Sequence, residues 1–278
     1  MKMSNNPLCE LYDREPDAAE HFLPEKRRKG QGDIKVGLAQ YIYLINNVSA
    51  KPISKNLQFQ IVYSDFFDFR GKLSTERGTA WCKYFQVMQK MQGRMKENKE
   101  ELNLKDVLEK LESVQEQVEV VFGTKLLSML NKEKMPPWDR MVRKVLEPHL
   151  KHFKIEVPKN YKKDKLPNFD EWDTFYTKLC GWYKGFVVEE KSRLEEKKGW
   201  LYQFYQWFDT DWFKWYKKSL RTENRKWDGK KTREPVYQWF LAQQDSPPEK
   251  IRAIISDVKV IDLILWQRGY FPFECSHK

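Results

Sequence analysis

Apolar residues recur at spacings of three and four along most of this 278-residue chain. That period places them on one face of an α-helix, with charged residues on the opposite face. The pattern is clear at Ile34, Leu38, Ile42 and Ile45, and again from Trp81 to Met95. We therefore predict a mainly α-helical fold of the helical-bundle type.

One segment departs from the helical period. Near residue 60, apolar side chains alternate with the polar residues Gln58 and Gln60. Alternation of this kind is typical of a half-buried strand. The apolar members are Leu57, Phe59, Ile61 and Tyr63. The sequence thus allows at most one short β-hairpin, near residues 56–73.

A second regular pattern has the 3-4 spacing of nearly three heptads, the arrangement by which helices pack along a seam. Its members are Leu104, Val107, Leu111, Val114, Val118 and Val121. Packing against another helix of the same chain is the default interpretation. Self-association of two copies through these side chains is the alternative.

Changes in composition divide the chain into four parts. Residues 1–33 contain few periodic apolar positions and predict a mobile N-terminal arm. Residues 34–153 predict an N-terminal helical domain that includes the heptad-like helix. Residues 154–168 are rich in lysine and proline and predict a basic linker, which leaves residues 169–278 as a C-terminal helical domain rich in aromatic and basic residues.

The C-terminal part contains the most aromatic stretch of the chain, with ten aromatic side chains between residues 200 and 216. Projected at 3.6 residues per turn, they predict one amphipathic helix, or two helices that meet at Asp209–Asp211. An aromatic face this broad is first of all a hydrophobic core, because each ring buries a large area. Trp207 and Phe213 fall at the edges of the face and are candidates for exposed rings.

The formal net charge of +11 favours a polyanionic ligand. The positive charge is densest at residues 214–233, where nine basic residues accompany only Glu223 and Asp228: Lys214, Lys217, Lys218, Arg221, Arg225, Lys226, Lys230, Lys231 and Arg233. A second basic patch lies in the linker, at Lys159, Lys162, Lys163 and Lys165. Aromatic rings beside such cations suit unpaired bases and their phosphates. Trp207, Phe213 and Trp227 are the candidate stacking rings.

Recognised catalytic or cofactor motifs are missing from the sequence. It contains no phosphate-binding glycine loop and no nucleophile motif. His149 and His152 with Glu147, and Asp209 with Asp211, are better explained as helix-surface and helix-capping residues than as metal ligands. We therefore expect no cofactor, no metal and no enzymatic activity, with an enzyme of an unrecognised family as an alternative.

Four widely spaced cysteines predict reduced thiols, and hence a cytoplasmic or nuclear location. The sequence shows neither a signal peptide nor a transmembrane segment. Our leading hypothesis is a non-enzymatic nucleic-acid-binding protein that favours RNA or single strands, similar in composition to oligomerising viral nucleoproteins that package nucleic acid. The alternative is a helical adaptor or scaffold for protein–protein interaction, with an acidic partner.

Overall fold

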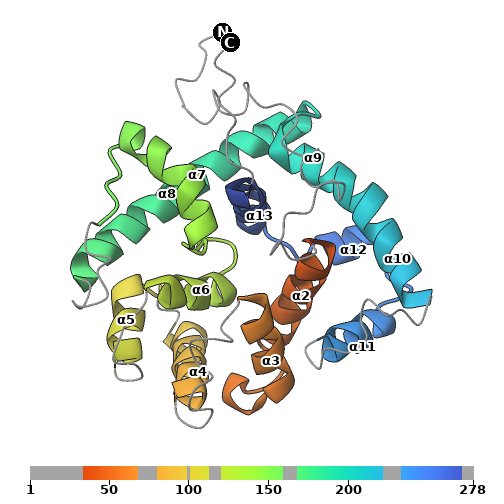
Figure 1. Ribbon diagram of the computed structural model, residues 1–278, viewed down its shortest axis with the longest axis horizontal. Coiled ribbons are helices and arrows are strands. Elements are labelled where there is room, and N and C mark those ends of the chain that lie inside the picture. Colours follow the sequence, from red (N-terminus) through yellow and green to blue (C-terminus); the bar gives the residue numbers. More distant parts are fainter. Residues whose placement is uncertain are drawn as a thin grey trace.

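The computed structural model describes residues 34–67, 80–98, 101–112, 120–158, 168–221 and 233–270, and within these ranges it contains helices and no strand (Figure 1). The mainly α-helical prediction is confirmed. The α-helices are α2 (Ile34–Asn47), α3 (Leu57–Phe66), α4 (Ala80–Asn98), α5 (Leu104–Glu112), α6 (Val120–Leu130), α7 (Arg140–Leu150), α8 (Phe169–Glu195), α9 (Gly199–Trp207), α10 (Phe213–Arg221), α11 (Glu234–Ala242), α12 (Pro248–Arg252) and α13 (Asp257–Tyr270). Two short 3-10 segments, η3 (Ile53–Lys55) and η4 (Lys151–Phe153), and one π-helical segment, η5 (Phe208–Trp212), complete the architecture.

The predicted strand is wrong over residues 57–66, which form α3; residues 68–73 lie outside the described residues. The side chain of Asn56 caps this helix by accepting a hydrogen bond from the backbone N–H of Phe59, 3.1 Å away. Gln60, which the alternation placed on the polar side of a half-buried strand, is buried: its amide donates to the Ile53 carbonyl oxygen and accepts from the indole N–H of Trp81. Hydrogen bonds of a buried polar residue thus override the alternating pattern.

Helix α13 lies in the middle of the fold and packs against α7, α8 and α9 (Figure 1). Its side chains Val260, Ile261 and Leu265 are completely buried. At Gly269 the backbone of α7 comes so close that a Cβ atom would stand 2.5 Å from the Met141 carbonyl oxygen. The crossing of α7 and α13 therefore requires glycine at this position.

The helices on the two sides of residues 154–168 pack against each other. Helix α5 contacts α8, and the Asp173 carboxylate on α8 accepts hydrogen bonds from the first backbone N–H groups of α5, at Leu104 (2.8 Å) and Lys105 (3.1 Å). Helix α2 likewise contacts α11. Buried residues from both sides belong to one hydrophobic cluster. The division into two helical domains stays a prediction.

The heptad-like seam is divided between separate helices. Leu104, Val107 and Leu111 lie on α5, which ends at Glu112, and all three are buried within the chain. Val121 lies on α6, whereas Val114 and Val118 are outside the described residues. Because the chain itself already covers Leu104, Val107 and Leu111, these three side chains cannot form the self-association surface that their spacing suggested.

The turn from α8 into α9 sets the direction of the aromatic stretch. Gly199 has a φ of 93°, and a Cβ atom there would meet the Glu190 carboxylate oxygen at 2.7 Å. This buried carboxylate accepts hydrogen bonds from the backbone N–H groups of Trp200 (2.5 Å) and Leu201 (3.2 Å) and so caps α9. Burial raises the pKa of Glu190, while the two N–H groups oppose that rise.

Candidate nucleic-acid interface

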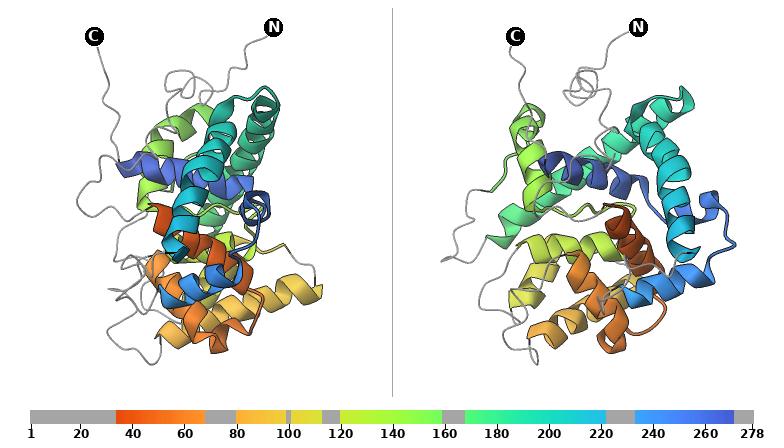
Figure 2. Two further views of the ribbon diagram at one scale, coloured as in Figure 1. Left: turned by 90° about the vertical axis from the view of Figure 1, so that its right-hand side faces the viewer. Right: turned by 45° about the vertical axis from the view of Figure 1, so that its right-hand side comes forward.

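The aromatic stretch forms two helical segments joined by a π-helical turn, η5. In α9 the buried arc is centred on Trp200, Phe204 and Trp207, and in α10 it is centred on Tyr216 and Leu220. A π turn adds a residue to the turn, and one residue corresponds to a rotation of about 100° around the helix. The wider π turn takes up the extra residue, so the buried residues Trp200, Phe204, Phe208, Trp212, Tyr216 and Leu220 follow one another at a spacing of four along one continuous rod in Figure 2.

This local change of period explains where the structure differs from the helical projection. A single wheel at 3.6 residues per turn leaves out the π turn and puts Trp207 at the edge of the apolar face. In the structure Trp207 is only 5% exposed, so its prediction as a stacking ring is wrong. The alternative prediction, two segments that meet at Asp209–Asp211, agrees better with the π-helical segment at Phe208–Trp212. Asp209, however, forms an ion pair with Arg252 on α12 rather than capping a helix.

Helix α10 turns its apolar side inward. The Tyr216 hydroxyl lies 3.1 Å from the Phe240 carbonyl oxygen and 3.2 Å from that of Gln243, and it donates its hydrogen bond at the end of α11. The Trp212 indole N–H, one residue before α10, donates to the Lys35 carbonyl oxygen on α2 at 2.9 Å. These contacts fix which side of α10 faces away from the protein.

The outward side of α10 is basic. Lys214, Lys218 and Arg221 are exposed and follow one another at spacings of four and three residues, so they share one helical face. Among the residues that the structure describes, Lys214 and Arg221 form no ion pair. We call these three residues the α10 stripe. They form a line of cations, and the described part of the chain places no acidic partner on Lys214 or Arg221, the two ends of that line.

Lys217 lies beside the α10 stripe but is held by the protein. It is partly buried, and its ammonium group donates to the Gln244 carbonyl oxygen. The same group lies 5.2 Å from the centre of the Phe213 ring and 5.7 Å from that of Tyr216. Phe213, predicted as a stacking ring, is therefore a partly buried ring against which Lys217 packs.

Arg233 is the remaining predicted binding residue that the structure describes. It is partly exposed and precedes α11, a helix that contacts α10. The other predicted binding residues lie outside the described residues: Arg225, Lys226, Trp227, Lys230 and Lys231, and in the linker Lys159, Lys162, Lys163 and Lys165. The structure thus brings Lys214, Lys217, Lys218 and Arg221 together on α10.

The acidic residues considered as metal ligands have other partners. Glu147 forms an ion pair with Arg143, 2.7 Å apart, and the Thr210 hydroxyl donates to Asp211 at 2.9 Å. In the described residues no group of three histidine, cysteine, aspartate or glutamate side chains could hold a metal ion. None of the described helices has the length and apolarity that crossing a membrane requires.

Sequence reasoning missed a buried ion pair in α13. The Lys259 ammonium lies 2.5 Å from an Asp262 carboxylate oxygen, and only 7% and 3% of the two side chains is exposed. The pKa of Asp262 is raised to about 6: burial is the main cause and Asp139 adds to it, while the positive charges of Lys259 and Lys125 oppose the rise. The spacing of three residues was a signal for the pair, but spacing alone does not reveal burial.

Comparison with protein families, with curated proteins and with solved structures finds no significant match. Any functional assignment must therefore come from the residues themselves.

Proposed function

We propose that this chain is a non-enzymatic nucleic-acid-binding protein of the cytoplasm or nucleus, and that the α10 stripe contacts backbone phosphates. The observation that carries the proposal is the alignment of Lys214, Lys218 and Arg221 on the exposed face of one helix. Consecutive turns repeat every 5.4 Å or so, which gives a row of cations along the helix axis. Such a row suits a ligand that repeats a negative charge along its length.

The apolar surface favours nucleic acid over the adaptor hypothesis. In the described residues the exposed large hydrophobic side chains are Leu57 on α3 and Val188 on α8, each 63% exposed. Neither belongs to α10. Protein–protein interfaces depend on a few large side chains buried at their centre, and the exposed face of α10 offers charge without such anchors.

A preference for RNA or single strands requires exposed aromatic rings on which unpaired bases can stack. The predicted rings that the structure describes offer fewer such surfaces than the sequence suggested. Trp207 is buried and Phe213 is partly covered by Lys217, which leaves Trp227, outside the described residues, as the candidate ring. Our proposal therefore emphasises the phosphate backbone and keeps the single-strand preference as a dependent hypothesis.

Replacing Lys214, Lys218 and Arg221 together by Gln tests this proposal. Each phosphate contact to a single strand contributes about 0.7 to the slope of log affinity against log salt. At the α10 stripe, loss of three contacts should reduce that slope by about 2 and weaken binding about a hundredfold at about 0.1 M salt. Fluorescence anisotropy with a labelled random-sequence single strand, repeated over a range of salt concentrations, measures both quantities.

A matched control removes the same number of charges elsewhere. Lys51, Lys55 and Lys83 are exposed residues before η3, in η3 and on α4, and their joint replacement by Gln lowers the net charge by the same amount. This control variant should bind almost as the wild type does. If both triple variants lose affinity equally, the effect is one of net charge, and the assignment to α10 is incorrect.

A further inference from the structure

A second basic stripe lies on the outer face of α7 and its continuation η4. Arg140, Lys144 and Lys151 are all exposed, and their spacings of four and seven residues put them on one side of the helix. Among the described residues these three side chains form no ion pair. Glu147 lies on the same side, between Lys144 and Lys151, and its charge is balanced by Arg143 at 2.7 Å. The three cations, which we call the α7 stripe, extend about 16 Å along the helix axis at 1.5 Å per residue.

Packing holds the α7 stripe in place. The opposite side of α7 buries Val142, Val145 and Leu146, and the helix lies against α13. Asp139 caps the start of α7 by accepting hydrogen bonds from the N–H groups of Met141 (2.8 Å) and Val142 (3.0 Å). Because this helix is already ordered, binding of a ligand costs little backbone conformational entropy.

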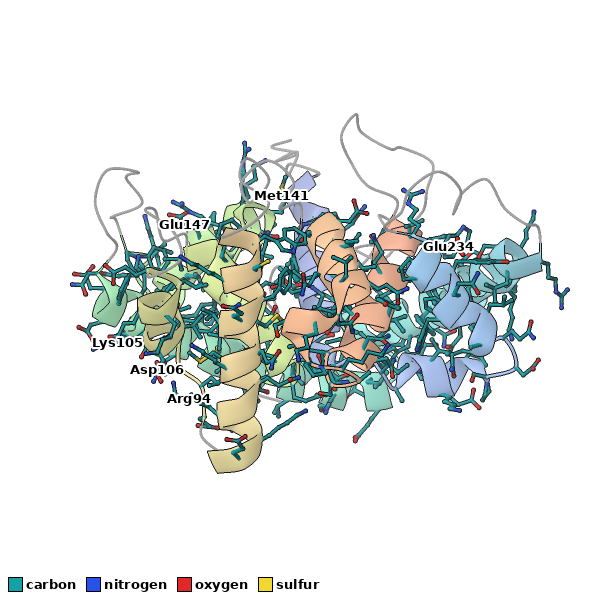
Figure 3. All side chains as sticks on the ribbon, turned by 90° about the horizontal axis from the view of Figure 1, so that it is seen from below. Arg94, Lys105, Asp106, Met141, Glu147 and Glu234 are labelled. Carbon is teal, nitrogen blue, oxygen red and sulfur yellow. The ribbon has the colours of Figure 1, made fainter. Side chains whose placement is uncertain are left out.

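The two stripes lie on separate parts of the molecule. In Figure 1, α7 and α10 are on different sides of α13. In Figure 3, Met141 and Glu147 mark α7 to the left of the centre, while Glu234 marks the start of α11, the neighbour of α10, on the right. Each stripe is on the face of its helix that points away from the buried core. Two short strands could therefore bind to the two stripes without sharing any contact.

We propose that the α7 stripe is a second nucleic-acid-binding surface, so that one protein chain joins two segments of nucleic acid. This inference rests on the proposed function, because it assigns to α7 the same phosphate ligand as to α10. The exposed large hydrophobic residues Leu57 and Val188 lie on neither helix, which disfavours a lipid surface, where apolar side chains would accompany the cations. Joining two segments is what a packaging protein must do.

The test uses short single strands carrying two different fluorophores, in excess over the protein. Sedimentation velocity with detection of both labels should find wild-type complexes that contain one protein chain and two strands. The variant with Arg140, Lys144 and Lys151 replaced by Gln should bind one strand, and its two-strand complex should weaken about a hundredfold at about 0.1 M salt. The Lys51, Lys55 and Lys83 control should keep both strands.

The possible outcomes separate this inference from the proposed function. If the wild type binds one strand per chain and the α10 variant binds none, the α7 surface is refuted while binding through α10 stands. If the α7 variant still binds two strands, the second site lies elsewhere and the inference is also refuted. If the α10 variant and the α7 variant each bind one strand per chain, both assignments are supported. If the wild type binds no strand, both proposals fail.

Discussion

Replacing Lys259 by Met is expected to lower the free energy of unfolding by about 3–5 kcal/mol above neutral pH, because it leaves the buried Asp262 carboxylate without its partner. The lysine ammonium lies 2.5 Å from that carboxylate and 4.9 Å from the centre of the Tyr41 ring. Chemical denaturation followed by circular dichroism measures the change. A variant as stable as the wild type would contradict the burial of this pair.

The same substitution should be less harmful in acid. The pKa of Asp262 in the folded protein, raised to about 6, exceeds its ordinary value of 3.8, so the folded state takes up a proton before the unfolded state does. The contribution of Asp262 to stability therefore falls as the pH rises from about 4 to about 6. Asp139, Lys125 and Lys259 act on this carboxyl group through their charges.

Asp262→Asn supplies the control for this titration. Its side chain has no proton to release, so the wild type should lose stability relative to the Asn variant over that pH interval and then level off. A difference that stays constant between about pH 4 and pH 7 would show that Asp262 titrates at its ordinary pKa.

Gly269→Ala is expected to destabilise the fold by about 3 kcal/mol, at the upper end of the usual cost of overpacking. The added methyl group would lie 2.5 Å from the Met141 carbonyl oxygen and 2.8 Å from the Met141 carbonyl carbon. These are backbone atoms that no side-chain rotation can move, so α7 and α13 must separate. Equilibrium unfolding in urea measures the loss.

Gly181→Ala on α8 is the matched control, because it adds the same methyl group where no atom lies within 4 Å. Alanine is favoured over glycine inside a helix by about 1 kcal/mol. This variant should therefore be as stable as the wild type or more stable. If Gly269→Ala behaves in the same way, the close crossing of α7 and α13 is not present in solution.

The helical class could be predicted from the sequence because apolar spacing reports which side of a helix is buried. An alternating pattern gave the wrong prediction at α3, where the buried amide of Gln60 bonds to Ile53 and Trp81, residues from outside the segment. The helical spacing misplaced Trp207, because a projection at one fixed period cannot include a π turn. Lateral hydrogen bonds and local changes of period depend on tertiary structure, and a pattern along the chain does not contain them.

The basic face of α10 could be predicted in part. Charge density identified Lys214, Lys217, Lys218 and Arg221, but it gave all four the same role. The structure separates Lys217, which bonds to Gln244, from the three exposed cations. The α7 stripe was not predicted as a binding surface. Glu147 and several apolar residues stand between its members in the sequence, so the density of basic residues there is low.

The central claim is that the protein binds nucleic acid through the α10 stripe, and purification at low salt without nuclease tests it most directly. The chain contains 11 tryptophans and 13 tyrosines, so the protein alone has a strong ultraviolet absorbance that nucleic acid alters measurably. We expect the wild type to show excess nucleic-acid absorbance that a high-salt wash removes. The variant in which Lys214, Lys218 and Arg221 are replaced by Gln should show a clearly smaller excess than the wild type, because only the α7 stripe is left to hold nucleic acid. A wild type that is free of nucleic acid at low salt would contradict the proposal.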